Sequence, residues 1–276
     1  MEIGFLVIFV VISTSLVNGS CPSVCSCSST TQGSDVNCNS RSLLHFPDLP
    51  INTYYIDLRY NSITEIDVQL CKDMPKLKHL FVNDNQISVV QVNAFEDCEI
   101  MDTIYLQYNK IRSIESFTFI NMPKLIKLYI DNNEISTIEP YSFMNLPNLL
   151  NMDLSGNNMS HIDETMFRNL TSLSLLLFKN NKIQSLETNT FINMVHLSEL
   201  NLSGNNISHI EEHAFGNLPS LAALHLTGNP LNCDCSIFSF WTWLIERASI
   251  GTSAICSNGT LVISLESAAL ETCNCK

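Results

Sequence analysis

One asparagine recurs at every twenty-fourth position through most of the chain. Its eight positions are Asn61, Asn85, Asn109, Asn133, Asn157, Asn181, Asn205 and Asn229. Apolar residues stand five and three positions before each asparagine, and another stands two positions after it. A fixed period of this length is typical of a solenoid, in which each repeat buries its apolar face only against its neighbours. The sequence therefore predicts a stack of similar coils.

Each position of the repeat has a physical reason. The apolar pair before the asparagine alternates as in a short strand with one buried face. The asparagine side chain can hydrogen-bond loop backbone that no strand ladder reaches. Phenylalanine follows six of the asparagines by ten residues, and Cys71 takes that place in the first repeat. We expect these phenylalanines to point inward from the outer side and to stack on one another.

The pattern, L-x-x-L-x-L-x-x-N-x-I, resembles that of leucine-rich repeat proteins. This resemblance implies an α/β solenoid, a curved horseshoe with a concave parallel β-sheet. The convex side is then mostly irregular or short-helical, and disulfide-bonded caps close both ends. Residues 53–230 are expected to hold seven full 24-residue repeats and an eighth strand.

Cysteine-rich segments flank the repeats. Residues 20–52 contain Cys-x3-Cys-x-Cys-x10-Cys, and residues 231–276 contain Cys-x-Cys-x20-Cys-x16-Cys. They resemble the N- and C-terminal caps of Slit, Toll-like receptor ectodomains, variable lymphocyte receptors and invertebrate proteins made only of such repeats. Spacing alone leaves the pairing open. The resemblance implies the pairs Cys21–Cys27, Cys25–Cys38, Cys233–Cys256 and Cys235–Cys273.

Three of the 11 cysteines lie outside this cap pattern. Cys71 and Cys98 both occupy positions that should face the interior of adjacent repeats. A disulfide between them and two buried thiols are both open, because a bridge requires Cα atoms within about 7 Å. Cys275 is then left over, either as a free thiol or as an intermolecular bond that links a dimer.

The start of the chain predicts a secretory signal peptide over residues 1–19. Residues 3–12 are apolar or small, and the small residues Val17 and Gly19 place the cleavage after Gly19. No other stretch approaches about 18 apolar residues, so no membrane anchor is expected in this chain. The protein is expected to be secreted and extracellular, where disulfides persist.

Charge and motifs disfavour several functions. The chain has 14 Lys+Arg against 27 Asp+Glu, and its formal net charge of −13 disfavours nucleic acid as a partner. The catalytic patterns G-x-S-x-G and H-E-x-x-H and the Walker loop are absent. His209 and His213 are four residues apart but lie where a helix is not assured, so no zinc site is expected. We predict no enzymatic activity, no cofactor and no metal.

The outward strand positions are predicted to form the recognition surface. Residues six, four, two and one before each asparagine alternate with the buried pair, so they should face the concave side. Aromatic residues gather at these positions in the first four repeats, and tyrosine suits protein-binding surfaces because it offers large contact area at low entropy cost. The alternative is that strands simply favour aromatic residues. The predicted ligand-binding residues are Tyr55, Asp57, Arg59, Tyr60, His79, Phe81, Asp84, Tyr105, Gln107, Tyr108, Lys127, Tyr129 and Asp131.

The glycosylation signals also favour the first four repeats as the binding region. The five sequons that remain after signal cleavage are Asn158, Asn169, Asn201, Asn206 and Asn258, and all lie in the C-terminal half. Asn201 should project from the concave face, where a glycan would obstruct docking on the later repeats. We therefore expect a protein or carbohydrate ligand on the concave face of the first four repeats.

The family resemblance implies a binding function. The leading interpretation is innate immune recognition of microbial or self surface molecules, as in variable lymphocyte receptors and invertebrate repeat-only proteins. The alternative is a Slit-like matrix or developmental ligand that binds cell-surface receptors. A further possibility is that the chain is an ectodomain fragment of a membrane receptor.

Overall fold

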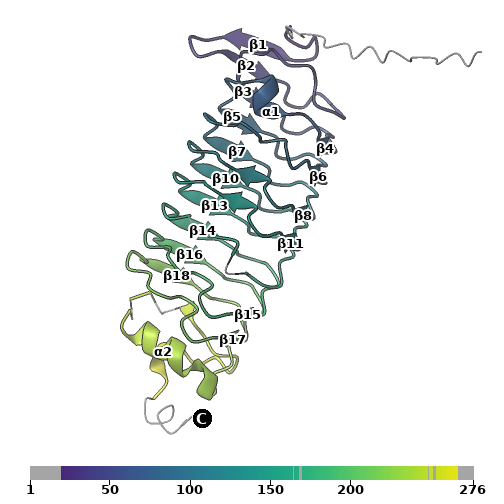
Figure 1. Ribbon diagram of the computed structural model, residues 1–276. Coiled ribbons are helices and arrows are strands. Elements are labelled where there is room, and N and C mark those ends of the chain that lie inside the picture. Colours follow the sequence, from purple (N-terminus) through teal and green to yellow (C-terminus); the bar gives the residue numbers. More distant parts are fainter. Residues whose placement is uncertain (1–19, 164, 168–169, 248, 251–252, 267–276) are drawn as a thin grey trace, which may run out of the picture.

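The computed structural model describes residues 20–163, 165–167, 170–247, 249–250 and 253–266. Its backbone winds into a solenoid whose concave side is one long sheet (Figure 1). Ten strands follow one another in the order β1-β2-β3-β5-β7-β10-β13-β14-β16-β18. Their bounds are β1 Ser26–Ser29, β2 Ser34–Asn37, β3 Thr53–Asp57, β5 His79–Phe81, β7 Thr103–Tyr105, β10 Lys127–Tyr129, β13 Asn151–Asp153, β14 Leu175–Leu177, β16 Glu199–Asn201 and β18 Ala223–His225.

The strand register repeats the sequence period. Leu128 of β10 lies beside Ile104 of β7 and Met152 of β13, each one full repeat away. All neighbouring pairs from β2 onward are parallel, and only β1 and β2 are antiparallel. We number the coils one to eight by their asparagines, from Asn61 in coil one to Asn229 in coil eight. A residue can thus be placed by its coil and by its distance from that asparagine.

The convex side consists of turns, short strand pairs and one helical turn. The helix is α1, Leu70–Asp73. The parallel pairs are β4 (Glu65–Ile66) with β6 (Val89–Val90), β8 (Ser113–Ile114) with β11 (Thr137–Ile138), β9 (Phe119–Ile120) with β12 (Phe143–Met144), and β15 (Ser185–Leu186) with β17 (His209–Ile210). This arrangement agrees with the leucine-rich repeat solenoid that the sequence predicts.

The asparagines form an internal ladder of hydrogen bonds between coils. Asn133 is typical: its Nδ2 donates to the carbonyl oxygen of Ile130 in its own coil and of Leu106 in the preceding coil, both at 3.0 Å. Its Oδ1 accepts from the backbone nitrogen of Ile111 at 3.1 Å. All eight asparagines are at most 8% exposed, so these bonds compensate backbone groups that water cannot reach.

The phenylalanines on the outer side form the predicted inward row, with one interruption. Successive rings lie 4.9 Å apart between Phe95 and Phe119, and 5.8 Å apart between Phe119 and Phe143. Phe167 instead meets Phe178, the residue that follows β14, edge-on at 5.7 Å. All six phenylalanines at this position are buried.

Disulfides tie down both ends and the first coils. The N-terminal cap contains Cys21–Cys27 and Cys25–Cys38, the pairing that the family resemblance implies, with Cα separations of 5.9 and 4.4 Å. Cys71 and Cys98 are joined, with their Cα atoms 5.0 Å apart, rather than present as two thiols. Cys233 is bonded to Cys256. Cys235 is disulfide-bonded as well, whereas Cys273 and Cys275 lie outside the described residues.

The C-terminal cap closes the core with a helix. After the 3-10 turn η1 (Cys235–Ile237), helix α2 (Phe238–Ile245) buries Phe240 and Leu244 against the last coils. Phe215 continues the inward row into this helix, because its ring lies 5.3 Å from that of Phe240 and 4.9 Å from that of Trp243. A second 3-10 turn, η3 (Val262–Ser264), follows.

Residues 1–19, expected to be a signal peptide, lie outside the described residues. Within the part of the chain that the structure describes, no helix has the length and apolar character needed to cross a membrane.

Candidate functional site

A continuous row of aromatic rings crosses the concave sheet from β3 to β10. Ring centroids are 5.1 Å apart between Tyr55 and Phe81, 4.8 Å between Phe81 and Tyr105, and 5.0 Å between Tyr105 and Tyr129. All four side chains are half-buried. We call these four residues the concave aromatic row. The parallel register brings Phe81, Tyr105 and Tyr129 side by side as equivalent positions, and Tyr55 meets Phe81 diagonally from β3.

The carboxylate of Asp57 is not on the surface, contrary to the prediction from the sequence. Asp57 is only 2% exposed, and Arg59 donates to its two carboxylate oxygens from Nε at 2.9 Å and from Nη2 at 2.6 Å. The Arg59 guanidinium also lies 5.7 Å from the centroid of the Phe81 ring. Burial alone would raise the pKa of Asp57, but the hydrogen bonds from Arg59 outweigh it and lower that pKa. Arg59, half-buried, covers this carboxylate from the concave side.

A polar row lies beside the aromatic row, two residues before the asparagines. It contains Asn83, Gln107 and Asp131 in coils two to four. The Oδ1 atom of Asn83 and the Oε1 atom of Gln107 are buried and have no hydrogen-bond partner. Burial first, and then the charge of Asp153, raise the pKa of Asp131 to about 6. Unpaired buried acceptors are uncommon and costly, so this row is an unusual part of the concave face.

The position directly before each asparagine has left-handed backbone in all eight coils. These residues are Tyr60, Asp84, Tyr108, Asn132, Gly156, Asn180, Gly204 and Gly228. Glycine, asparagine and aspartate tolerate this conformation, whereas a bulky side chain in it costs about 1 kcal/mol. Tyr60 and Tyr108 adopt φ of 56° and 54° while 56% and 57% exposed, so neither core packing nor backbone preference explains them. Strain of this kind is characteristic of functional positions.

A charged cluster lies at the N-terminal side of the aromatic row. His79 Nδ1 lies 2.8 Å from Asp102 Oδ1, and Lys78 Nζ lies 3.3 Å from Asp102 Oδ2. Lys78 is also 5.8 Å from the centroid of the Tyr54 ring. Burial is the main cause that lowers the pKa of His79.

Of this cluster, only His79 was predicted from the sequence. Tyr54, Lys78 and Asp102 were missed, although all three stand seven positions before an asparagine. The opposite charges of Lys78 and Asp102, one repeat apart, were the available signal, because the register brings equivalent positions side by side.

Two further predicted residues border the aromatic row. Lys127 is half-buried at the start of β10, directly beside Thr103 and Asn151 in the sheet. Asp84 accepts a hydrogen bond from Asn83 Nδ2 at 2.7 Å. The predicted ligand-binding residues thus all lie in coils one to four. Asp57 is the member that is buried below the surface.

The later coils carry a different concave surface. Leu175 and Leu177 of β14 and Glu199 of β16 lie two and three strands beyond Tyr129 of β10. Asn201 lies on this face as expected, half-buried, and its Oδ1 accepts from the backbone nitrogen of Ser203 at 3.0 Å. Among the other sequons, Asn206 and Asn258 are exposed, Asn158 is half-buried, and Asn169 lies outside the described residues.

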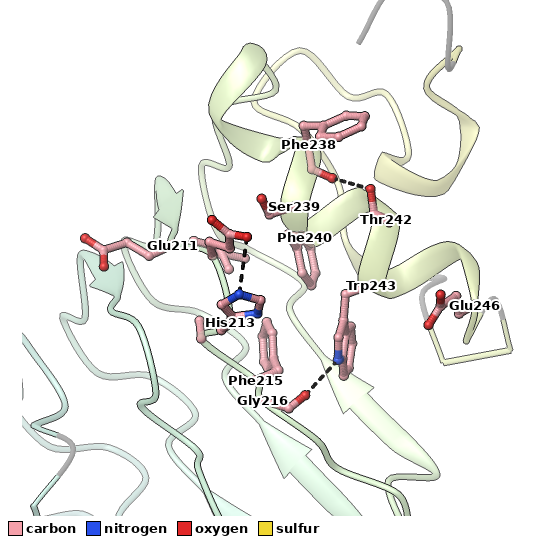
Figure 2. Close-up of a pocket in the computed structure, with 13 residues that line it drawn as sticks. Glu211, His213, Phe215, Gly216, Phe238, Ser239, Phe240, Thr242, Trp243 and Glu246 are labelled. Carbon is pink, nitrogen blue, oxygen red and sulfur yellow. Dashed lines mark hydrogen bonds and ion pairs between the residues drawn. The ribbon is translucent and has the colours of Figure 1, made fainter. Parts of the chain in front are cut away.

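A pocket of about 310 Å³ lies between coil seven and helix α2 (Figure 2). The stacked rings of Phe215, Phe240 and Trp243 line it. No sequence pattern indicated it, because it forms between a repeat and the cap. Two of its polar side chains have internal partners: Trp243 Nε1 donates to the carbonyl oxygen of Gly216 at 3.2 Å, and His213 pairs with Glu212. Since these contacts are internal, the pocket is explained by closure of the core.

Within the described ranges, no three or more histidine, cysteine, aspartate or glutamate side chains are grouped so that they could hold a metal ion. His209 and His213 have separate neighbours: His209 Nδ1 lies 2.8 Å from Ser208 Oγ, and His213 pairs with Glu212.

Comparison with known proteins agrees with this architecture. The leucine-rich repeat family model matches residues 51–111, 101–159, 123–181 and 174–231, which together span more than half of the chain. The chain therefore belongs to the leucine-rich repeat family. It is 37% identical over 93 residues to leucine-rich repeat-containing protein 3 of Danio rerio, which covers 33% of this chain and 35% of that protein. It is 34% identical over 71 residues to human leucine-rich repeats and immunoglobulin-like domains protein 1, which covers 25% of this chain and 6% of that protein.

The chain thus matches about a third or less of the length of these relatives. A solved structure with the same fold is human 5T4 (Wnt-activated inhibitory factor 1, trophoblast glycoprotein). The two align with a TM-score of 0.62 at 20% identity, over 92% of this chain and 99% of that one. Leucine-rich repeat proteins generally mediate protein–protein interactions. Its disulfides indicate an oxidising, extracellular environment.

Proposed function

We propose that this protein is a secreted recognition module that binds a protein partner on the concave face of coils one to four. The observation that carries the proposal is the concave aromatic row, four rings in contact across successive strands. Aromatic side chains dominate the energetics of protein-binding surfaces because they bury a large area with few rotatable bonds. Contiguous apolar patches on a protein surface mark interaction sites.

Two further features support the same face. Tyr60 and Tyr108 keep a strained backbone where glycine or asparagine would be relaxed, and the buried acceptors of Asn83 and Gln107 lack partners. Both features are expected on a surface that a partner contacts. A glycan on Asn201 would crowd coils six to eight, which directs docking to the N-terminal half of the face.

The proposed setting is innate immune recognition of a microbial or self surface protein, by likeness to variable lymphocyte receptors and invertebrate repeat-only proteins. The alternative is a Slit-like ligand, or the ectodomain of a receptor, that binds a host cell-surface protein; the Slit-type cysteine spacing of the C-terminal cap favours it. The two hypotheses predict different partners and a different regulation of transcription. A rise in transcript after microbial challenge supports the immune role, and capture of a host receptor ectodomain without such a rise supports the alternative.

The experiment for the concave face compares two double variants of the secreted, glycosylated protein. Tyr105→Ala with Tyr129→Ala removes the centre of the concave aromatic row. Leu175→Ala with Leu177→Ala removes half-buried side chains of β14 on the same face, two coils from Tyr129. Partners captured from native extracellular fluid by cross-linking are identified and their affinities measured. Circular dichroism melts ensure that both variants are folded.

We expect the tyrosine variant to lose affinity for the captured partner at least tenfold and the leucine variant to keep it. If the folded tyrosine variant binds as tightly as the parent protein, the concave aromatic row is not the recognition surface. Equal losses in both variants would show that binding is spread over the whole face, and would also overturn the proposal.

A further inference from the structure

Both ends of the concave aromatic row pair a ring with a carboxylate. At the N-terminal end, Asp57 of β3 lies beside Phe81 of β5. At the C-terminal end, Asp153 of β13 lies beside Tyr129 of β10. All four residues stand four positions before the asparagines of their coils. Each end therefore places a carboxylate and a ring at equivalent positions of adjacent strands.

The N-terminal end supplies its own cation. Arg59, two residues before the asparagine, donates to both carboxylate oxygens of Asp57, at 2.9 and 2.6 Å. Its guanidinium also lies 5.7 Å from the Phe81 centroid. This combination of a bidentate ion pair with an aromatic ring is the geometry in which arginine binds strongly.

The C-terminal end lacks that cation. Ser155 stands in coil five where Arg59 stands in coil one, and only its backbone nitrogen donates to Asp153 Oδ1, at 2.8 Å. The same position in coil four is Asp131, a second carboxylate. In the described part of the chain, no lysine, arginine or histidine forms an ion pair with Asp131 or Asp153. Burial of Asp131 and its proximity to Asp153 raise the pKa of Asp131 to about 6, which reflects uncompensated negative charge.

The polar row between the two ends also requires donors. Asn83 Oδ1 and Gln107 Oε1 are buried acceptors without partners, and they lie in the two coils before that of Asp131. A partner group that brings N–H donors and no acceptor adds no further unpaired acceptor beside this row. The guanidinium has five donors in one plane, no acceptor, a permanent charge and a face that stacks on aromatic rings.

We infer that an arginine side chain of a protein partner binds at the C-terminal end of the concave aromatic row, over Tyr129 and against Asp131 and Asp153. This inference rests on the proposed function and names the chemistry of its partner. A lysine ammonium would match the charge, but it is not planar and cannot stack on the face of the ring as a guanidinium does. Glycan hydroxyls carry no positive charge and would leave both carboxylates uncompensated.

The test uses three fluorescein-labelled peptides of ten residues in which serine alternates with arginine, lysine or citrulline. Citrulline keeps the planar shape of arginine without its charge. Binding to the full secreted protein is measured by fluorescence anisotropy in about 0.15 M salt, where the Debye length of about 8 Å limits long-range attraction. Chitohexaose is titrated in parallel as a carbohydrate probe.

Variants locate the site. Asp131→Asn with Asp153→Asn removes two charges at the proposed position. Glu96→Gln with Glu99→Gln removes two charges from exposed residues on the outer side, as a matched control. Ser155→Arg places a guanidinium of the chain itself two residues after Asp153, as Arg59 stands two residues after Asp57.

We expect the arginine peptide to bind at least tenfold more tightly than the citrulline peptide and more tightly than the lysine peptide. The Asp131/Asp153 variant should lose at least tenfold in affinity for it, and the Glu96/Glu99 variant should not. Ser155→Arg should abolish peptide binding and raise the melting temperature, because it supplies the missing ion pair internally.

Equal affinity for the arginine and citrulline peptides, or equal losses in the two charge variants, overturns the inference in favour of non-specific attraction. Equal affinity for lysine overturns the assignment to guanidinium. Binding of chitohexaose without binding of the arginine peptide overturns it in favour of carbohydrate. If the captured protein partner depends on Tyr105 and Tyr129 but not on Asp131 and Asp153, the proposed function stands and only the arginine inference fails.

Discussion

Asn133 donates from Nδ2 to the carbonyl oxygen of Leu106, 27 residues earlier in the chain, at 3.0 Å. The same side chain bonds Ile130 in its own coil and accepts from Ile111. One amide therefore satisfies three backbone groups of two coils. This contact joins neighbouring coils on the side away from the inward phenylalanines, and its equivalents recur along the solenoid.

Asn133→Ala should destabilise the protein by about 3 kcal/mol. The backbone N–H of Ile111 is left without a partner, at a cost of roughly 1 kcal/mol or more. The carbonyls of Leu106 and Ile130 keep the side chains of Asn109 and Asn157 as donors, but each loses one hydrogen bond, at about 1 kcal/mol each. Urea unfolding followed by circular dichroism measures the change. Asn93→Ala, at an exposed position outside the left-handed row, is the control for a general effect of substitution. A loss below about 1 kcal/mol would show that water replaces the amide.

Replacing both Cys71 and Cys98 by alanine should lower the free energy of unfolding by about 3 kcal/mol. The bridge closes a loop with a sequence separation of 27, and cross-links of that length restrict the unfolded chain to about this extent. Mass spectrometry of a non-reduced digest should first find the two cysteine peptides linked. Two separate, alkylated peptides would contradict the bridge.

Asp131→Asn should stabilise the protein at pH 7.5, and this gain should vanish near pH 4. The folded pKa of about 6 exceeds the ordinary value of 3.8, so the native state takes up a proton between these values while the unfolded state does not. Stability due to this group therefore rises as the pH falls from about 6 to about 4, and above pH 6 the charged form opposes folding. Asp153 is the charged neighbour that contributes to the shift.

The measurement is the difference in melting temperature between Asp131→Asn and the parent protein at both pH values. Comparing the two proteins at each pH cancels the titration of other groups. A difference that is the same at pH 7.5 and pH 4 would contradict the raised pKa.

Tyr108→Asn should keep or raise stability while it weakens partner binding. Asparagine tolerates the φ of 54° at this position, and the strain relieved is about 1 kcal/mol. Thermal melts and the affinity for the captured partner are measured on the same preparation. Asp84→Asn, at the equivalent position of coil two, is the control. Lower stability together with unchanged affinity would show that Tyr108 is a structural residue.

The periodic part of the fold follows directly from the sequence. Leu128, Ile130 and Asn133 have equivalents in every coil, and each coil meets the same neighbours, so one pattern fixes the strand, the buried face and the ladder. The inward phenylalanines follow for the same reason. The apolar pair and the asparagine repeat eight times and the phenylalanine six times, so no long-range detail is needed to place them.

Features that depend on one particular coil were harder to predict. Asp57 alternates as an outward residue, yet Arg59 folds over it and removes it from water. The sequence does not indicate the left-handed backbone of Tyr108, because tyrosine does not favour that conformation. The pocket beside Trp243 arises between a repeat and the cap, where no period applies.

The constant register also determines how the length of the concave surface can change. Because every strand pair from β3 to β18 is offset by one repeat length, an insertion of one repeat would present each neighbour with the contacts that it already has. Such an insertion would lengthen the concave surface by about 4.8 Å and leave both caps in place. The distance between the two carboxylate-flanked ends of the aromatic row is thus adjustable in discrete steps, independently of the side chains that make up each end.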